Sequence, residues 1–351
     1  MRVLRGLALV AGLIVLMVLV VRSGAGAVWG SIRAVSPAQL ALLCVIYGVS
    51  QALSTLGWRC AFSRARVPFF RLLAARSAGE AVNAVTMLGG VGGEPVKAWL
   101  VSDEAPKEES VASVIIAKTA ITAAQLMLLF IGTVLALTVL DLDRLVVRAM
   151  LGLLVVESLA VGGFFAVQVT GVLGRSRRLL AAVGVPTAGV HVHRLDRALR
   201  RYYTKEWPRF LASVAWHFAG WMVAVVEAAY ALHLVGAGSA WSVAVVVEAL
   251  GAGVRFLTFF VPASVGVLES ANAAVFVALG FTASAGLAFT LLRRARQAIW
   301  VAGGILVLAL MRAKWVRAQW RRHVAPITVK RRGRARGRAV AARAAAPRSH
   351  P

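Results

Sequence analysis

Residues 76–101 read RSAGEAVNAVTMLGGVGGEPVKAWLV, an apolar stretch that packs four glycines and one proline into seven consecutive residues. Glycine leaves the backbone unrestrained and proline lacks an N–H, so we expect no membrane helix to continue unbroken through it. Pro95 suits the first turn of a new helix, whose N-terminal dipole would favour the charge of Glu94. Irregular backbone at membrane depth must be buried in protein or line a cavity. We therefore predict a re-entrant helix–break–helix over 77–100; a glycine-rich cytoplasmic loop is the alternative.

The whole chain has the composition of a protein whose solvent is lipid. Of its 351 residues, 60% are hydrophobic and 15% are charged, and its mean hydropathy is +0.77. Soluble domains have about 45–50% apolar and about 25% charged residues, so an ordinary soluble protein is excluded. Because a helix needs about 20 apolar residues to cross the hydrocarbon core, the sequence predicts an all-α, polytopic membrane helix bundle over 1–311, with about eight transmembrane segments and one or two re-entrant broken hairpins. The predicted spans are Leu7–Val21, Leu40–Trp58, Val111–Leu140, Val146–Thr170, Phe210–Val235, Trp241–Val261, 264–281 and 285–311.

The distribution of positive charge predicts the orientation. The 40 Lys and Arg residues outnumber the 14 Asp and Glu residues, which gives a net charge of +26. In a chain of membrane segments, such an excess marks cytoplasmic loops. We therefore expect both termini and the 171–209 loop in the cytoplasm, and the protein in a bacterial inner (cytoplasmic) membrane. Arg293, Arg294 and Arg296 do not fit the pattern, and both a membrane-face position and a bundle-interior position stay open for them.

Two basic segments are expected at the cytoplasmic face. In the 171–209 loop, apolar residues recur at helical spacing and predict an amphipathic helix lying on that face, with Trp207 among the headgroups; a solvated loop is the alternative. These residues are Val192, Leu195, Leu199 and Tyr202. The 312–351 tail lacks apolar periodicity, so a disordered basic segment is expected. Tail and loop can hold anionic headgroups, although such a tail more often only enforces topology, and no nucleic-acid partner is expected.

A second interruption lies far downstream, in 255–281. Pro262 and Gly266 break an apolar run, and Glu269 follows at membrane depth. Ionisable groups are costly there unless they are paired or solvated, so each is a functional candidate. Glu248 and Arg255 are seven residues apart on one helix face, so they could neutralise a shared interior surface. Segments broken by glycine and proline in two halves of a chain are a pointer to a transporter's binding site.

The candidate substrate-binding residues come from these two breaks, and we expect Glu94 and Glu269 to face one polar cavity with Arg255 as their cation. They are Glu80, Asn83, Gly92, Gly93, Glu94, Lys97, Arg255, Pro262, Ser264, Gly266 and Glu269. Lys118, Thr122 and Gln125 share a helix face and could reach the same cavity. The sequence has no GxSxG, no HExxH and no acidic metal cluster, so we predict no catalytic residue, metal or cofactor. The two cysteines exclude a disulfide framework.

Both broken segments resemble the flippase-like transmembrane domain of lysylphosphatidylglycerol synthases, over about residues 40–310. The runs Gly79-Glu80-Ala-Val-Asn83…Gly92-Gly93-Glu94 and Phe260-Val-Pro262…Gly266-Val-Leu-Glu269 look most like its hopanoid-associated branch. Met87-Leu88 stands where that branch usually has Leu-Pro, which weakens the substrate assignment. The resemblance implies an eight-helix protein that moves lipids between leaflets. In full synthases a soluble aminoacyl-transfer domain follows; here only the basic tail follows, so synthase activity is not implied.

The leading interpretation is a lipid translocase or transport protein for a phospholipid or an isoprenoid or hopanoid lipid. One alternative is a membrane-embedded enzyme or accessory subunit acting on a lipid-linked substrate. Another is an assembly partner that transports nothing. A translocase predicts Glu80, Glu94, Arg255 and Glu269 around one cavity; an enzyme predicts a compact acid/base or metal constellation; an assembly partner predicts polar residues that pair internally and leave no cavity.

Overall fold

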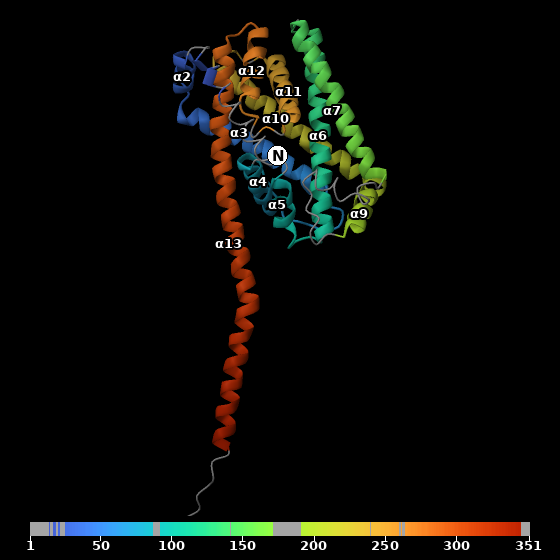
Figure 1. Cartoon of the computed structure of the whole chain (residues 1–351), viewed down its shortest axis with the longest axis vertical. Coiled ribbons are helices and arrows are strands. Elements are labelled where there is room, and N and C mark those ends of the chain that lie inside the picture. The colour runs from blue at the N-terminus through green and yellow to red at the C-terminus, as the bar shows by residue number, and fades with distance from the viewer. Residues whose placement is uncertain are drawn as a thin grey trace, which may run out of the picture. The chain divides into compact units, whose positions relative to one another are not determined.

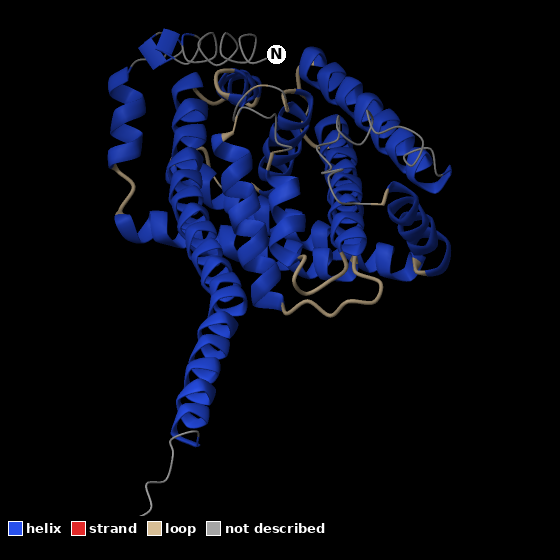
Figure 2. Ribbon diagram, turned by 60° about the horizontal axis from the view of Figure 1, so that its bottom comes forward, coloured by secondary structure: helices blue, strands red, loops and turns tan. Residues whose placement is uncertain are grey.

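A computed structural model describes residues 25–86, 92–140, 142–170, 191–238, 240–259, 261 and 264–344, together with a few positions between 14 and 21. This part of the chain contains helices and loops and no strand (Figure 2), as predicted. The helices are α2 (Ala25–Arg33), α3 (Pro37–Cys60), α4 (Phe69–Val85), α5 (Gly93–Val101), α6 (Lys107–Thr138), α7 (Arg144–Thr170), α9 (Val192–Lys205), α10 (Trp207–Leu234), α11 (Trp241–Leu257), α12 (Val267–Ala278) and α13 (Ala283–Ala344).

Five of the described helices are long and apolar enough to cross a membrane. They are α3, α6, α7, α10 and the Ala283–Ala313 part of α13. At most 39% of the residues in their most apolar windows are buried inside the protein, so most of these side chains need an apolar solvent. The predicted 264–281 span holds only α12, whose 12 residues reach about 18 Å and fall short of a full crossing. The predicted Leu7–Val21 span lies mostly outside the described residues.

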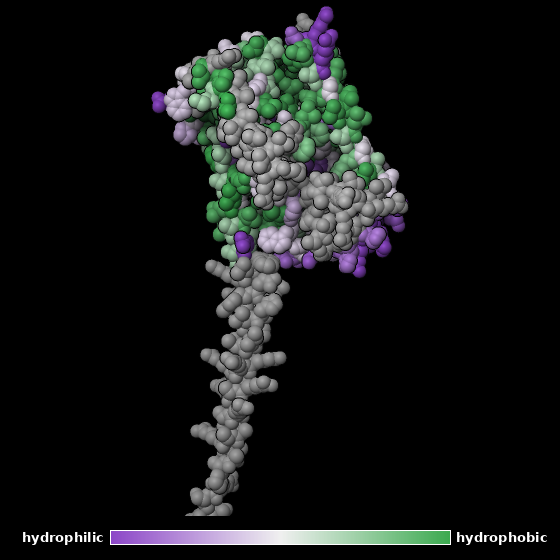
Figure 3. All heavy atoms as spheres, in the orientation of Figure 1, coloured by the Kyte–Doolittle hydropathy of each residue, from purple (hydrophilic) through white to green (hydrophobic). Residues whose placement is uncertain are grey.

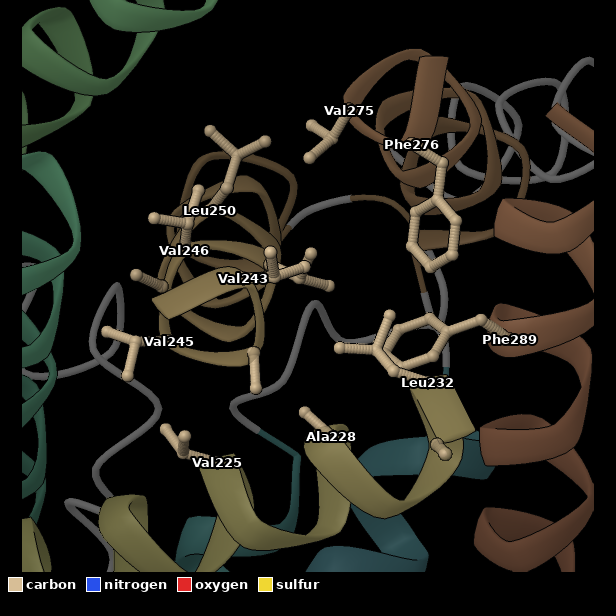
Figure 4. Packing of buried hydrophobic residues seen from close by; sticks show 14 of the residues in the cluster. Val225, Ala228, Leu232, Val243, Val245, Val246, Leu250, Val275, Phe276 and Phe289 are labelled. Atoms are coloured by element: carbon tan, nitrogen blue, oxygen red, sulfur yellow. The ribbon is translucent and has the colours of Figure 1, made fainter. Parts of the chain in front are cut away.

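Two compact units divide the chain, 1–305 and 306–351. The centre of the first unit is a cluster of buried hydrophobic side chains where α10, α11, α12 and α13 meet (Figure 4). Phe276 of α12 packs there on Phe289 of α13 with ring centroids 5.4 Å apart. This packing fixes α11 and α12 on either side of the second break.

Small residues let the membrane helices approach closely. Ser50 Oγ of α3 donates a hydrogen bond of 2.8 Å to the carbonyl of Gly220 in α10. Gly304 of α13 lies against α4, where an added Cβ would come 2.4 Å from the Ser77 carbonyl oxygen. Helix pairs in lipid associate through such close packing and hydrogen bonds, since lipid tails are as apolar as the helices. The α13 helix is thereby held against the first break as well as the second.

The predicted amphipathic helix in the 171–209 loop is α9, while 171–190 lie outside the described residues. Its apolar face is buried as the pattern indicated, with Leu195, Leu199 and Tyr202 at most 1% exposed. That face packs on protein: Tyr202 Oη donates to the carbonyl of Cys60, and Tyr203 Oη donates to Gln168 Oε1 of α7. The α9 helix therefore links α3 to α7 through these two hydrogen bonds.

The expectation of a disordered 312–351 tail is wrong for most of its length. The α13 helix continues through Ala344 (Figure 1). Alanine and arginine, which dominate this segment, are both strong helix formers, so a helix needs no apolar face to form there. Absence of apolar periodicity was therefore an insufficient sign of disorder.

Candidate functional site

The first break is a helical hairpin made by α4 and α5, which lie side by side at the start of α6 (Figure 1). The α5 helix begins at Gly93, so Glu94 and Pro95 lie in its first turn as predicted. Asn83 Oδ1 of α4 accepts a 2.6 Å hydrogen bond from Gly93 N. Residues 87–91 lie outside the described part. Helices therefore flank the interruption as expected, α4 ending at Val85 and α5 beginning at Gly93, while the re-entrant course of 77–100 stays a prediction.

Charged side chains gather where this hairpin meets α6. Lys97 Nζ lies 2.6 Å from Glu80 Oε1 and 3.3 Å from the Glu94 carboxylate. Lys118 Nζ of α6 lies 3.7 Å from Glu94 Oε1. The sequence placed Lys118 on a face that could reach the site, and it does. We call these residues, together with Arg76, the hairpin cluster.

The hairpin cluster lines a cavity of about 40 Å³ between α3, α4, α5 and α6, with Trp58 in its apolar wall. One buried water needs ~10–15 Å³, so the enclosed space holds about three. The Lys97 and Glu94 side chains are 8% and 9% exposed, whereas Glu80 and Lys118 are 40% and 51% exposed. The cluster thus has a buried inner pair and an accessible outer rim.

Arg76 gives the hairpin cluster its excess positive charge. Its Nε donates a 2.7 Å hydrogen bond to Gln51 Oε1, which aims the guanidinium into the cavity. Within 4.0 Å it forms no ion pair with a described residue. Three cations, Arg76, Lys97 and Lys118, therefore face the two carboxylates of Glu80 and Glu94.

The second break separates α11 from α12. Gly266 has φ +82°, a backbone conformation that glycine adopts without a Cβ penalty. Its N–H donates a 2.8 Å hydrogen bond to Glu269 Oε2 and so starts α12. Ser264 Oγ accepts a 2.8 Å hydrogen bond from Thr258 Oγ1 and closes the turn. Pro262 lies outside the described residues.

A second charged group, the core cluster, joins α10, α11 and α13. Glu248 pairs with Arg255 at 3.0 Å and with Arg293 at 2.5 Å. Glu227 pairs with Arg293 at 3.4 Å and with Arg296 at 2.9 Å. Glu248 and Arg255, which the sequence placed on one helix face, thus form an ion pair with each other. Arg293 and Arg296, which the sequence could place either at a membrane face or inside the bundle, lie inside the bundle.

Glu94, Glu269 and Arg255 form ion pairs with different residues, so the structure does not show the single shared cavity that was expected around them. Glu94 belongs to the hairpin cluster, Arg255 belongs to the core cluster, and Glu269 pairs with Arg294 of α13. Buried charges take the nearest opposite charge because unpaired ones are costly in a dry interior. The pair of Glu269 with Arg294 and the pairs of Glu94 with Lys97 and Lys118 thus belong to separate groups of charges.

Several residues of these clusters were missed as site candidates. Arg76 opens the quoted stretch but was not named as a substrate-binding candidate. Glu227 was not named either, although it lies between two arginines of α13. The signal that could have found the core cluster was the Leu291-Leu-Arg293-Arg294-Ala-Arg296 run, because three arginines in an apolar helix require carboxylate partners.

The sequence of this chain matches a known family over most of its length. Residues 3–302 match the family described as the lysylphosphatidylglycerol synthase TM region. The chain belongs to this family. Its membership makes it a membrane protein related to lipid metabolism or lipid transport. No curated protein and no solved structure matches the chain.

The described residues of this synthase-type transmembrane region offer no group of three or more His, Cys, Asp or Glu side chains able to hold a metal ion. Glu157 of α7 accepts a hydrogen bond from Gln125 of α6, and this contact ties α6 to α7. The accessible charged side chains are those of the hairpin cluster, and they can bind a charged group by ion pairing.

Proposed function

We propose that the protein is a lipid translocase of the bacterial inner membrane, in which a headgroup passes the hairpin cluster while the hydrocarbon chains stay in lipid. The observation that carries this proposal is the cavity of the hairpin cluster, which has a charged wall, an accessible rim and a net positive charge. Family membership supports a lipid as the cargo. We assign the protein no enzymatic step.

The charge of the hairpin cluster favours an anionic headgroup. Arginine presents a planar fork that matches phosphate oxygens, and the fork of Arg76 is aimed into the cavity by Gln51. The enclosed volume admits water or the oxygens of one phosphate, so the remainder of a headgroup must stay at the rim near Glu80 and Lys118. Phospholipids and phosphorylated isoprenoid lipids share this chemistry.

The remaining parts of the proposal concern orientation and partners. Arginines flank α4 on its N-terminal side and Lys107 follows α5, so we place the hairpin mouth, both termini and α9 on the cytoplasmic side. Membrane lipids are the proposed partners, with anionic headgroups at the basic segments. The core cluster pairs its charges internally, and we assign it a structural role.

The test is movement of a fluorescent anionic phospholipid across vesicles that contain the purified full chain. Arg76→Gln and Lys118→Gln should each slow movement about tenfold or more, because a charge-assisted hydrogen bond contributes about 1.5–3 kcal/mol. Arg66→Gln and Lys107→Gln remove the same charge from exposed positions outside the cavity and serve as matched controls. Equal rates in the cavity variants and the controls would refute the proposal, provided that all four elute as folded protein.

A further inference from the structure

A second concave surface lies at the other end of α6, where it turns into α7. Its volume is about 250 Å³, and its lining combines four apolar side chains with two arginines. We call it the elbow groove. It is lined by Ala136, Leu137, Leu142, Arg144, Val147 and Arg148.

The two arginines of the elbow groove are exposed, and neither forms an ion pair with a described residue. Arg144 and Arg148 are four residues apart, so they share one side of α7. The nearby Asp143 carboxylate accepts a 2.6 Å hydrogen bond from Leu145 N and is thereby directed at the helix start. Cations at a helix N-terminus oppose the dipole, so an anion at this place would be stabilised by both the dipole and the arginines.

The elbow groove lies at the opposite end of α6 from the hairpin cluster. Lys118 and Leu137 are separated by nineteen residues of α6, about 28 Å along the axis, which is close to the ~30 Å hydrocarbon thickness. In Figure 3, hydrophilic groups lie over the start of α7 and over α9. In the orientation proposed above, Arg144 and Arg148 lie on the non-cytoplasmic side, against the usual bias of positive charge.

We propose that the elbow groove binds one anionic phospholipid from the leaflet opposite the hairpin mouth. Arg144 and Arg148 hold the lipid phosphate, and Leu137 and Val147 contact the first part of an acyl chain. The charge selects an anion and the apolar wall selects a lipid over a soluble anion. Binding here needs no transport, but the choice of leaflet rests on the orientation given with the proposed function.

The experiment places a fluorophore in the groove and measures its quenching by lipids with brominated chains in nanodiscs. The full chain carries Cys44→Ala and Cys60→Ala, with Leu137→Cys labelled at the groove and, in a second protein, Leu159→Cys labelled on the exposed face of α7. Brominated phosphatidylglycerol should quench position 137 at concentrations at least about fivefold below brominated phosphatidylcholine, because each arginine attracts an anionic lipid. Position 159 should not distinguish the two lipids.

Two charge-matched variants complete the test. Arg144→Gln with Arg148→Gln should abolish the selectivity at position 137, whereas Arg64→Gln with Arg66→Gln should preserve it. Equal quenching by both lipids at position 137, or selectivity that survives loss of the groove arginines, would overturn the proposal. Relief of the quenching by inorganic phosphate at the lipid's own concentration would assign the groove to soluble anions and would overturn it as well.

Discussion

Gly93 lies directly against the carbonyl oxygen of Gly79, so that a Cβ added to Gly93 would come 1.9 Å from that oxygen. A Cβ on Gly79 would in turn meet the Lys97 side chain at 2.4 Å. The crossing of α4 and α5 therefore exists only because both positions lack a side chain. It also sets the position of Lys97 between its two carboxylates.

We expect Gly93→Ala to force the hairpin apart. The clash is with backbone and cannot be relieved by a side-chain rotation, so the cost should exceed the ~1–3 kcal/mol of ordinary overpacking. Gly152→Ala on α7 is the matched control, since its Cβ would meet nothing within 4 Å. Thermal unfolding in detergent and lipid movement in vesicles measure the difference. A Gly93→Ala protein with unchanged unfolding temperature and rate would contradict the structure of the hairpin.

Asn83→Ala should loosen the start of α5. It leaves the Gly93 N–H without its acceptor, which costs about 1–3 kcal/mol where the group is buried. Asn83→Asp keeps an acceptor oxygen at the same place and should recover part of the loss. The hydrogen-exchange rates of the α5 amides report the effect locally. Equal rates in Asn83→Ala and Asn83→Asp would show that the hydrogen bond contributes nothing.

Arg293→Gln should destabilise the first unit more than any exposed arginine substitution. The change leaves Glu227 and Glu248 with one cation fewer in a dry interior, and breaking a buried pair costs about 3–5 kcal/mol. Arg201→Gln on the exposed side of α9 is the control and should be near neutral. A double-mutant cycle with Glu248→Gln should give a coupling free energy well above zero; additivity would mean that the pair is not formed in the membrane.

The two ends of α6 and their neighbours should be reached from opposite sides of the membrane. Single cysteines at the exposed positions Glu104 and Leu145, in a protein without Cys44 and Cys60, provide the test. We expect a membrane-impermeant thiol reagent to label Glu104→Cys only from the cytoplasm and Leu145→Cys only from outside. Labelling of both positions from one side would remove the basis of the proposed orientation.

Local chemistry made the breaks predictable. Glycine and proline act on their own backbone, so the sequence alone could place the start of α5 near Gly93 and the start of α12 near Gly266. Helix geometry likewise placed Glu248 and Arg255 on one helix face, because two residues on one helix have a known angular relation, and the structure shows that they pair. The composition alone predicted a membrane protein, because lipid is the solvent that accepts so many apolar side chains.

The sequence alone did not identify which residues of different helices form ion pairs. Glu269 could be recognised as a buried charge, but nothing in the 255–281 segment identifies Arg294 as its partner. The division of the site into two clusters depends on how α13 packs, which a single sequence does not specify. Length was also misleading for 264–281, where an apolar run long enough to suggest a crossing contains a turn and the short α12.

One consequence follows from the way α13 touches both breaks. It supplies Arg294 to Glu269, and ten residues further on, about 15 Å along the axis, Gly304 lies against the Ser77 carbonyl of α4. Because one continuous helix makes both contacts, we expect a displacement of α4 to move Arg294 and the start of α12 with it.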